Sequence, residues 1–226
     1  MTERDRLIEL LTAAGIEPKF VEPLAHFGVL LLETNRRFNL TGAATPEELA
    51  PHIVDSLSVV PFVRGPLADV GSGGGLPAIP VAIATGISVT LIESTTKKAA
   101  FLESLLAQLD LPGRVIPERA ELAGRHTDLR EQFACATARG VASAPTALEL
   151  TLPFVRLGGT AVLQRGKMDE RERNAVRDAA PMLGAVAAEE VSLADNRRLI
   201  IVRKQSATPE RFPRRVGIPE KRPLCL

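Results

Sequence analysis

The stretch Asp69-Val70-Gly71-Ser72-Gly73-Gly74-Gly75-Leu76-Pro77 constrains the fold more than any other part of the chain. Apolar residues 67–70 predict a short buried strand before it, and the glycines let the backbone turn sharply while staying open to a ligand. A dinucleotide fingerprint that begins at Gly71 would need a third glycine at the position of Leu76. The loop therefore favours a nucleotide-type site of another kind, although glycine-rich turns also occur without a ligand.

Strand-like and helix-like segments alternate after Gly65-Pro66. Strands are predicted at residues 67–70, 88–92, 114–117, 133–138 and 159–164, and helices at 77–85, 96–109, 120–131 and 145–156. This alternation implies right-handed crossovers and an α/β fold with an open, doubly wound, mostly parallel sheet. Two further β-like runs, 185–193 and 197–202, are joined by Ala194-Asp195-Asn196. They predict an antiparallel hairpin at the sheet edge, which brings the sheet to seven strands.

The loop pattern, acidic-x-Gly-x-Gly-x-Gly, resembles the first motif of the S-adenosylmethionine (SAM) methyltransferases, and an antiparallel last strand suits that variant of the fold. Ligands of such sheets lie beyond the carboxyl ends of the strands. Glu93 follows the second strand and can accept hydrogen bonds from a ribose diol, or it is simply a carboxylate that caps the next helix. Ala120 and Glu121 follow the third strand and can hold an adenine edge. Arg139 ends the fourth strand, and we expect it in the cleft.

The chain resembles the bacterial GidB, or RsmG, family from about Asn35 to Leu224. The segments that carry the resemblance are Asn39-Leu40-Thr41, His52-Ile53-Val54-Asp55-Ser56-Leu57, Asp69 to Pro80, Lys97-Lys98-Ala99-Ala100-Phe101-Leu102, Ala138-Arg139, Arg197-Arg198-Leu199 and Pro213-Arg214-Arg215-Val216-Gly217-Ile218-Pro219. The resemblance implies a SAM-dependent enzyme that methylates N7 of a guanine in 16S ribosomal RNA of the small ribosomal subunit. Family members often have Phe-Asp where this chain has Phe133-Ala134, and Lys-Gly where it has Arg165-Gly166, so no acidic role is expected at position 134.

The resemblance also implies the cofactor contacts. They are Gly71, Gly73, Leu76, Glu93, Ser94, Thr95, Ala120, Glu121 and Arg139. Basic residues that can contact RNA phosphates, or are solvated surface charges, are Arg36, Arg37, Arg165, Lys167, Arg197, Arg198, Arg214 and Arg215. No catalytic residue is assigned, because guanine N7 carries a lone pair and no proton and needs no general base. For the same reason we interpret His52 and Asp55, three residues apart on a predicted helix, as structural.

Three segments differ in composition. Residues 1–64 predict a helical extension without strands, 65–204 the SAM-binding core, and 205–226 a basic tail. Four prolines, Pro209, Pro213, Pro219 and Pro223, argue against regular structure in the tail, which we expect to be extended or disordered unless it docks. The net charge is only +1, but residues 203–222 hold seven Lys or Arg against two Glu.

The remaining expectations concern compartment and partners. The chain has 226 residues, no long apolar run and a charged N-terminus, which favours a cytoplasmic protein with no membrane partner. Its two cysteines indicate neither a disulfide framework nor a zinc site, so no metal is expected. The expected partner is 16S rRNA or the small subunit, bound by a monomer. A small-molecule SAM methyltransferase and a non-catalytic RNA-binding protein are the alternatives.

Overall fold

The computed structural model describes residues 1–186, 189–193 and 196–226. Within them seven strands form one sheet in the order β3-β2-β1-β4-β5-β7-β6. Their bounds are β1 (Leu67–Val70), β2 (Val89–Ile92), β3 (Gly113–Ile116), β4 (Phe133–Arg139), β5 (Val155–Arg165), β6 (Glu189–Ser192) and β7 (Arg198–Arg203). The first five strands are parallel, and β7 pairs antiparallel with both β5 and β6. The predicted α/β fold with a seven-stranded, mostly parallel sheet is confirmed. Of the predicted hairpin link, Ala194 and Asp195 lie outside the described residues.

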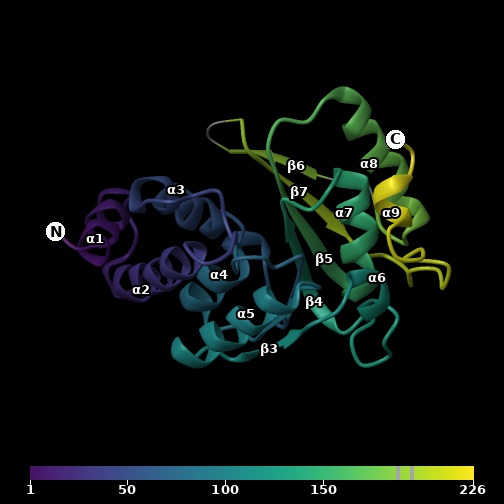
Figure 1. The fold of residues 1–226 in the computed structure, drawn as a ribbon. Helices are drawn as coiled ribbons and strands as arrows, with labels where there is room; N and C mark the ends of the chain where they lie inside the picture. Colours follow the sequence, from purple (N-terminus) through teal and green to yellow (C-terminus); the bar gives the residue numbers. More distant parts are fainter. Residues whose placement is uncertain (187–188, 194–195) are drawn as a thin grey trace.

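Helices cover both faces of the sheet (Figure 1). Their bounds are α1 (Glu3–Ala13), α2 (Pro18–Asn35), α3 (Pro46–Leu57), α4 (Ala78–Thr85), α5 (Thr96–Gln108), α6 (Ala120–Ala123), α7 (Ala144–Thr151), α8 (Glu170–Met182) and α9 (Ile218–Lys221). The helical N-terminus is confirmed, and α3 begins where Thr45 accepts a hydrogen bond from the Glu48 amide at 3.3 Å. No helix in the described part of the chain is long and apolar enough to cross a membrane.

Two predicted helices are shorter than expected. The helix predicted over 120–131 ends at Ala123, because Gly124 is a poor helix former and turns follow it as far as residue 131. The helix predicted over 145–156 ends at Thr151, because Pro153 cannot continue it and the chain passes through a 3₁₀ turn into β5. Both errors come from apolar residues that pack in the core without being helical.

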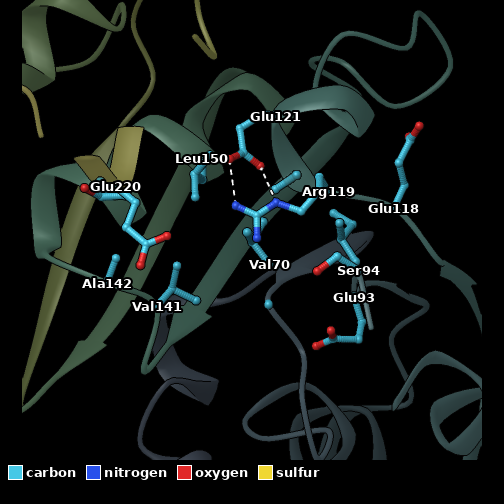
Figure 2. Close-up of a pocket in the computed structure, with 14 residues that line it drawn as sticks. Val70, Glu93, Ser94, Glu118, Arg119, Glu121, Val141, Ala142, Leu150 and Glu220 are labelled. Atoms are coloured by element: carbon cyan, nitrogen blue, oxygen red, sulfur yellow. Dashed lines mark hydrogen bonds and ion pairs between the residues drawn. The ribbon is translucent and has the colours of Figure 1, made fainter. Parts of the chain in front are cut away.

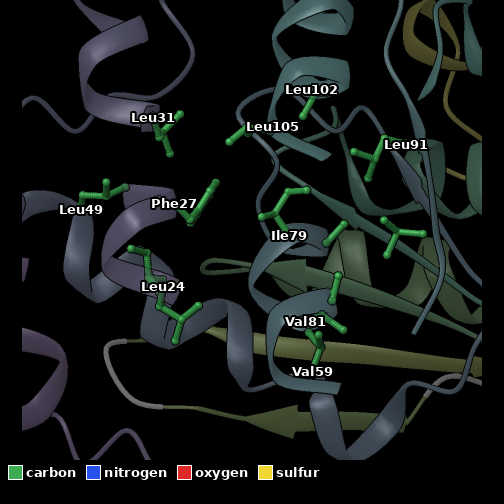
Figure 3. Packing of buried hydrophobic residues seen from close by; sticks show 14 of the residues in the cluster. Leu24, Phe27, Leu31, Leu49, Val59, Ile79, Val81, Leu91, Leu102 and Leu105 are labelled. Carbon is green, nitrogen blue, oxygen red and sulfur yellow. The ribbon is translucent and has the colours of Figure 1, made fainter. Parts of the chain in front are cut away.

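The N-terminal helices share one hydrophobic core with one face of the sheet. Phe27 and Leu49 from α2 and α3 pack toward Ile79 of α4 and Leu102 of α5, and all four are buried (Figure 3). Successive strand residues point to opposite faces of the sheet. Leu67 of β1 therefore joins this cluster, while Ala68 and Val70 join the second cluster under α6, α7 and α8. The carboxyl ends of β1, β2 and β4 therefore lie between two packed layers of helices.

The C-terminal tail docks on the second layer of helices. The Arg130 guanidinium donates hydrogen bonds to the carbonyls of Phe212 at 2.9 Å and Thr208 at 2.7 Å. The Arg214 guanidinium pairs with the Glu149 carboxylate, whose side chain is 0% exposed. The expectation that prolines exclude regular structure here is wrong, because the tail ends in α9 with Pro219 in its first turn, where a missing N–H costs nothing.

Candidate functional site

A cavity lies at the carboxyl ends of β1 and β2, beside the loop between β4 and α7. Its charged residues are Glu93, Glu118, Arg119, Glu121 and Glu220, and we call it the acidic cavity. Figure 2 shows the Arg119 side chain projecting toward Glu121, with Glu93 and Glu220 to either side. Glu220 belongs to α9, so the tail contributes one wall.

The glycine-rich loop forms the floor of this cavity. Gly71 lines it with φ of +71°, and a Cβ atom there would lie 2.7 Å from Val141 Cγ2. Any side chain at this position would therefore push into the opposite wall, and its backbone conformation favours glycine. Gly73 follows with φ of +53°. Leu76, a predicted cofactor contact, packs half-buried against the N-terminal core cluster.

Glu93 ties the glycine loop to the end of β2. Its carboxylate accepts hydrogen bonds from the Gly73 amide at 2.9 Å and from the Thr95 amide at 2.7 Å. The side chain lines the acidic cavity although the residue is only 7% exposed, and Ser94 lines the cavity next to it. Each carboxylate oxygen has a second lone pair, so Glu93 can accept further hydrogen bonds from a ligand.

Arg119 lines the site but is not among the predicted cofactor contacts. Its guanidinium donates to both Glu121 oxygens at 2.8 and 3.2 Å, and Glu121 also accepts the Gly217 amide at 3.0 Å. Burial alone would raise the pKa of Glu121, but these hydrogen bonds lower it below its usual value. Glu121 is thus an ionised anchor, and Arg119 is the group presented to the cavity. The only signal was its position directly before Ala120-Glu121.

Asp69, the acidic residue of the loop motif, lies below the cavity floor. It is 1% exposed, and its Oδ1 accepts the Thr137 hydroxyl at 2.7 Å while Oδ2 has no hydrogen-bond partner in the described chain. Burial raises the pKa of this carboxyl to about 7. A buried carboxylate with an unpaired oxygen is costly, which is typical of residues placed for a site rather than for stability.

A second cavity lies between α3 and the ends of β4, β5 and β7. Its charged residues are Asp55, Arg139, Arg165, Arg197 and Arg198, and we call it the basic cavity. The Asp55 carboxylate lies 3.6 Å from the Arg139 guanidinium and 3.2 Å from that of Arg197. Five charged residues from four segments of the chain thus converge on one place.

Arg139, predicted as a cofactor contact, points its guanidinium into the basic cavity. It donates to the His52 carbonyl at 3.1 Å and to the Ser56 hydroxyl at 3.2 Å, and it lies 2.8 Å from His52 Nδ1. Burial, followed by the charges of Arg139 and Arg197, lowers the pKa of His52, which stays neutral and accepts from Arg139. The backbone of Arg139 ends β4 beside the glycine loop, because the preceding residue, Ala138, pairs with Val70 of β1.

The loop Gly140–Ala142 separates the two cavities. Gly140 lines the basic cavity, whereas Val141 and Ala142 line the acidic one. Arg165 holds this loop by donating to the Val141 carbonyl at 3.1 Å and the Ala142 carbonyl at 2.8 Å, and it pairs with Glu172 at 3.0 Å. Arg165 is therefore a structural clamp as well as a predicted RNA contact.

The other predicted RNA contacts fall into two groups. Four of them have carboxylate partners, which are Glu3 for Arg36, Asp55 for Arg197, Glu190 for Arg198 and Glu149 for Arg214. Three others, Arg37, Lys167 and Arg215, are exposed on the surface. Within the described ranges no group of His, Cys, Asp and Glu side chains is arranged to hold a metal ion.

Comparison with known proteins identifies the family. The model of the GidB family, described as rRNA small subunit methyltransferase G, matches residues 21–201. The chain belongs to this family. A relative from Rubrobacter xylanophilus named ribosomal RNA small subunit methyltransferase G is 42% identical, over 86% of this chain and 80% of its own length. One of the same name from Moorella thermoacetica is 36% identical over 99% of this chain and 100% of its own length.

Solved structures share the fold of this GidB family member at low sequence identity. A mutein of the branched-chain polyamine synthase of Thermus thermophilus superposes with a TM-score of 0.60 at 14% identity, covering 83% of this chain and 65% of that one. A proposed SAM-dependent methyltransferase of Methanococcus maripaludis gives 0.52 at 15% identity, covering 71% and 89%. These similarities concern the fold, and the function rests on the family and on the two cavities.

Proposed function

We propose that this GidB family member transfers a methyl group from SAM to N7 of a guanine in 16S rRNA of the small ribosomal subunit, acting as a monomer in the cytoplasm. The observation that carries the proposal is the pair of oppositely charged cavities on the two sides of loop 140–142. One has the character expected for a cationic nucleoside cofactor and the other the character expected for an RNA segment.

The acidic cavity fits SAM in three respects. Its floor at Gly71 has no room for a side chain, Glu93 has acceptor capacity for ribose hydroxyls, and Asp69 below it has an oxygen without a partner. Four carboxylates line or anchor it, which favours a ligand that carries a sulfonium and an ammonium group. Ser94, Arg119, Ala120 and Glu121 also line this cavity. Thr95 and the backbone of Arg139, which ends β4 beside the glycine loop, complete the proposed cofactor contacts.

When bound, SAM supplies an electrophilic methyl group on its sulfonium. The residues of this chain need only hold the guanine and that methyl in line at about 3–3.5 Å, because N7 has a free lone pair and no proton to remove. Arg165 and Glu172 hold loop 140–142, against which both partners would lie. Glu93 holds the glycine loop at the correct distance from β2.

RNA phosphates would contact the basic residues around the second cavity. Arg197 and Arg198 line it, and Lys167 is exposed close by in sequence to the clamp Arg165. Arg36, Arg37 and Arg215 extend the proposed RNA contacts beyond the cavity. Arg214 stays among them only through its partly exposed side chain, because its guanidinium pairs with Glu149.

Transfer of a tritiated methyl group from SAM tests this function. Unmethylated small subunits, naked 16S rRNA and free nucleosides are offered in parallel, and the labelled product is digested to locate the methyl group. We expect label at guanine N7 in RNA or in subunits. Label on free nucleosides alone would favour a small-molecule enzyme, and RNA binding without SAM binding would favour a non-catalytic protein.

A further inference from the structure

We propose that the basic cavity is the pocket for the target guanine, and that Asp55 and Gln164 recognise its N1–H and N2–H₂ edge. The inference rests on the proposed function and extends it to the selection of the base. Both residues line the cavity, Asp55 from α3 and Gln164 from β5. Among the described side chains of the lining they are the hydrogen-bond acceptors, and the other polar side chains there are the guanidiniums of four arginines.

The Asp55 carboxylate is placed to face a ligand. Its side chain is 8% exposed and lies between the guanidiniums of Arg139 and Arg197, at 3.6 and 3.2 Å. These two guanidiniums pair with it in a site where a lone carboxylate would be costly. Two carboxylate oxygens offer about four lone pairs, so acceptor capacity remains after both arginines are paired.

Gln164 supplies a second acceptor whose orientation is fixed. Its Nε2 donates to the Asp55 carbonyl at 2.9 Å, and a carbonyl cannot donate in return, so the amide cannot be reversed. Its Oε1 is buried and has no hydrogen-bond partner within the described chain, although the residue is only 6% exposed. An unpaired buried acceptor at the wall of a polar cavity indicates a donor that arrives with the ligand.

Guanine is the base whose chemistry matches these acceptors. Its Watson–Crick edge presents two adjacent donors, N1–H and N2–H₂, whereas adenine presents the N1 acceptor there and would face Asp55 with like polarity. N7 lies on the opposite edge of the ring. Gly140 of loop 140–142 lines the same cavity as Asp55, so we infer that a guanine whose donor edge faces Asp55 turns N7 toward this loop. Gly140 has no side chain there, and a Cβ atom on it would meet nothing within 4 Å.

The Asp55 carboxylate would also stabilise the positive charge that the reaction creates. Methylation at N7 leaves a positively charged purine, and among the described residues that line this cavity Asp55 is the anion beside four guanidiniums. Because N1–H becomes more acidic as this charge develops, its hydrogen bond to a carboxylate strengthens toward the transition state. Asp55 would thus contribute to the rate as well as to the choice of base.

A double-mutant cycle between enzyme and substrate tests the proposal. Rates of methyl transfer (kcat/KM) are measured on small subunits that carry guanine or inosine at the target position, since inosine keeps N7 but lacks the N2 amino group. The wild-type protein should lose roughly 10- to 100-fold on inosine. Asp55→Asn should lose a similar factor on guanine and less than about threefold more on inosine, because the shared contact is already gone. Glu47→Gln, an exposed carboxylate on the same helix, should keep the full preference for guanine.

The outcomes separate the two proposals. Equal wild-type rates on guanine and inosine, or losses that multiply in Asp55→Asn, would overturn the base pocket and leave the methyltransferase function standing. No methyl transfer by the wild type to either substrate would overturn both. SAM affinity by calorimetry checks that each variant is folded. Should Asp55→Asn lose SAM binding, Gln164→Met enters the same cycle, and full guanine preference in that variant would overturn the proposal.

Discussion

The two cavities on either side of loop 140–142 have linings of opposite charge. Among the residues that the structure describes, the acidic cavity is lined by four carboxylates and one guanidinium, whereas the basic cavity is lined by four guanidiniums and one carboxylate. In each, the single minority charge is paired with the majority, Arg119 with Glu121 and Asp55 with Arg139 and Arg197. The protein thus separates its charges over the width of one short loop, and its net charge of +1 conceals this arrangement.

Two cavities of opposite charge allow one α/β sheet to bind a cation and an anion side by side. A cationic cofactor and a polyanionic RNA would compete for a uniformly charged cleft, whereas two fields of opposite sign direct each ligand to its own side. Loop 140–142 forms the boundary between the two cavities, and its clamp Arg165 comes from β5, outside the glycine motif. Four substitutions test whether the two cavities act separately.

Loss of the tail anchor should have the largest effect. Arg214→Ala leaves the fully buried Glu149 carboxylate without its counter-charge, so the free energy of unfolding should fall by about 3–5 kcal/mol. Because α9 carries Glu220 into the acidic cavity, SAM binding should weaken as well. Urea denaturation and calorimetry measure the two effects, and Arg215→Ala, an exposed neighbour, is the control. A loss below about 1 kcal/mol would mean that the pair does not hold the tail.

Asp69→Asn should change the pH dependence of stability. The pKa of Asp69 rises from an unfolded value near 3.8 to about 7 in the folded chain, because burial disfavours its charge. The buried Asp69 carboxyl therefore does not lower the free energy of unfolding below about pH 3.8, where it is protonated in both states. The free energy of unfolding falls as the pH rises from 3.8 to about 7, and the loss stays constant above that. Relative to wild type, the variant should gain about 3 kcal/mol between pH 5 and pH 8 in urea titrations. A pH-independent difference would place the carboxyl in a more polar environment.

Glu93→Ala should weaken SAM binding at the acidic cavity and leave RNA binding nearly unchanged. The Gly73 and Thr95 amides lose their acceptor, and a cofactor hydroxyl would lose its partner, so SAM affinity should fall by roughly 30- to 100-fold. RNA affinity, measured by filter binding, should change less than about twofold, because phosphate contacts lie elsewhere. The matched control is Glu103→Ala, an exposed carboxylate on α5. Unchanged SAM affinity would remove Glu93 from the site.

Arg197→Ala should give the converse and the smallest effect. RNA affinity should fall by about threefold to tenfold and the slope of log affinity against log salt by about one, while SAM affinity is unchanged. Arg203→Ala, at the far end of the strand that Arg197 precedes, is the control. A loss of SAM binding in Arg197→Ala would contradict the separation of the two cavities.

Much of this site could be predicted from local signals. The glycine spacing, the acidic residue after β2 and the strand–helix alternation predict that Gly71 and Glu93 share one site, and both line the acidic cavity. Glu220 could not be predicted, because it is brought to the cavity by a tail whose docking depends on buried Glu149 and on Arg130. Arg139 carried a strand-end signal, but which cavity its guanidinium enters depends on Asp55 and His52 of a distant helix.

The sequence by itself determined the class of fold, the family and the glycine loop, because these depend on short-range periodicity and on backbone positions that favour glycine. The tertiary structure decided how the charges are divided. Asp55, Arg139 and Arg197 are far apart in the chain. The packing of α3 over the ends of β4 and β7 brings the two guanidiniums within 3.6 Å of the Asp55 carboxylate. Contacts of this range depend on three-dimensional packing, which local propensity does not specify.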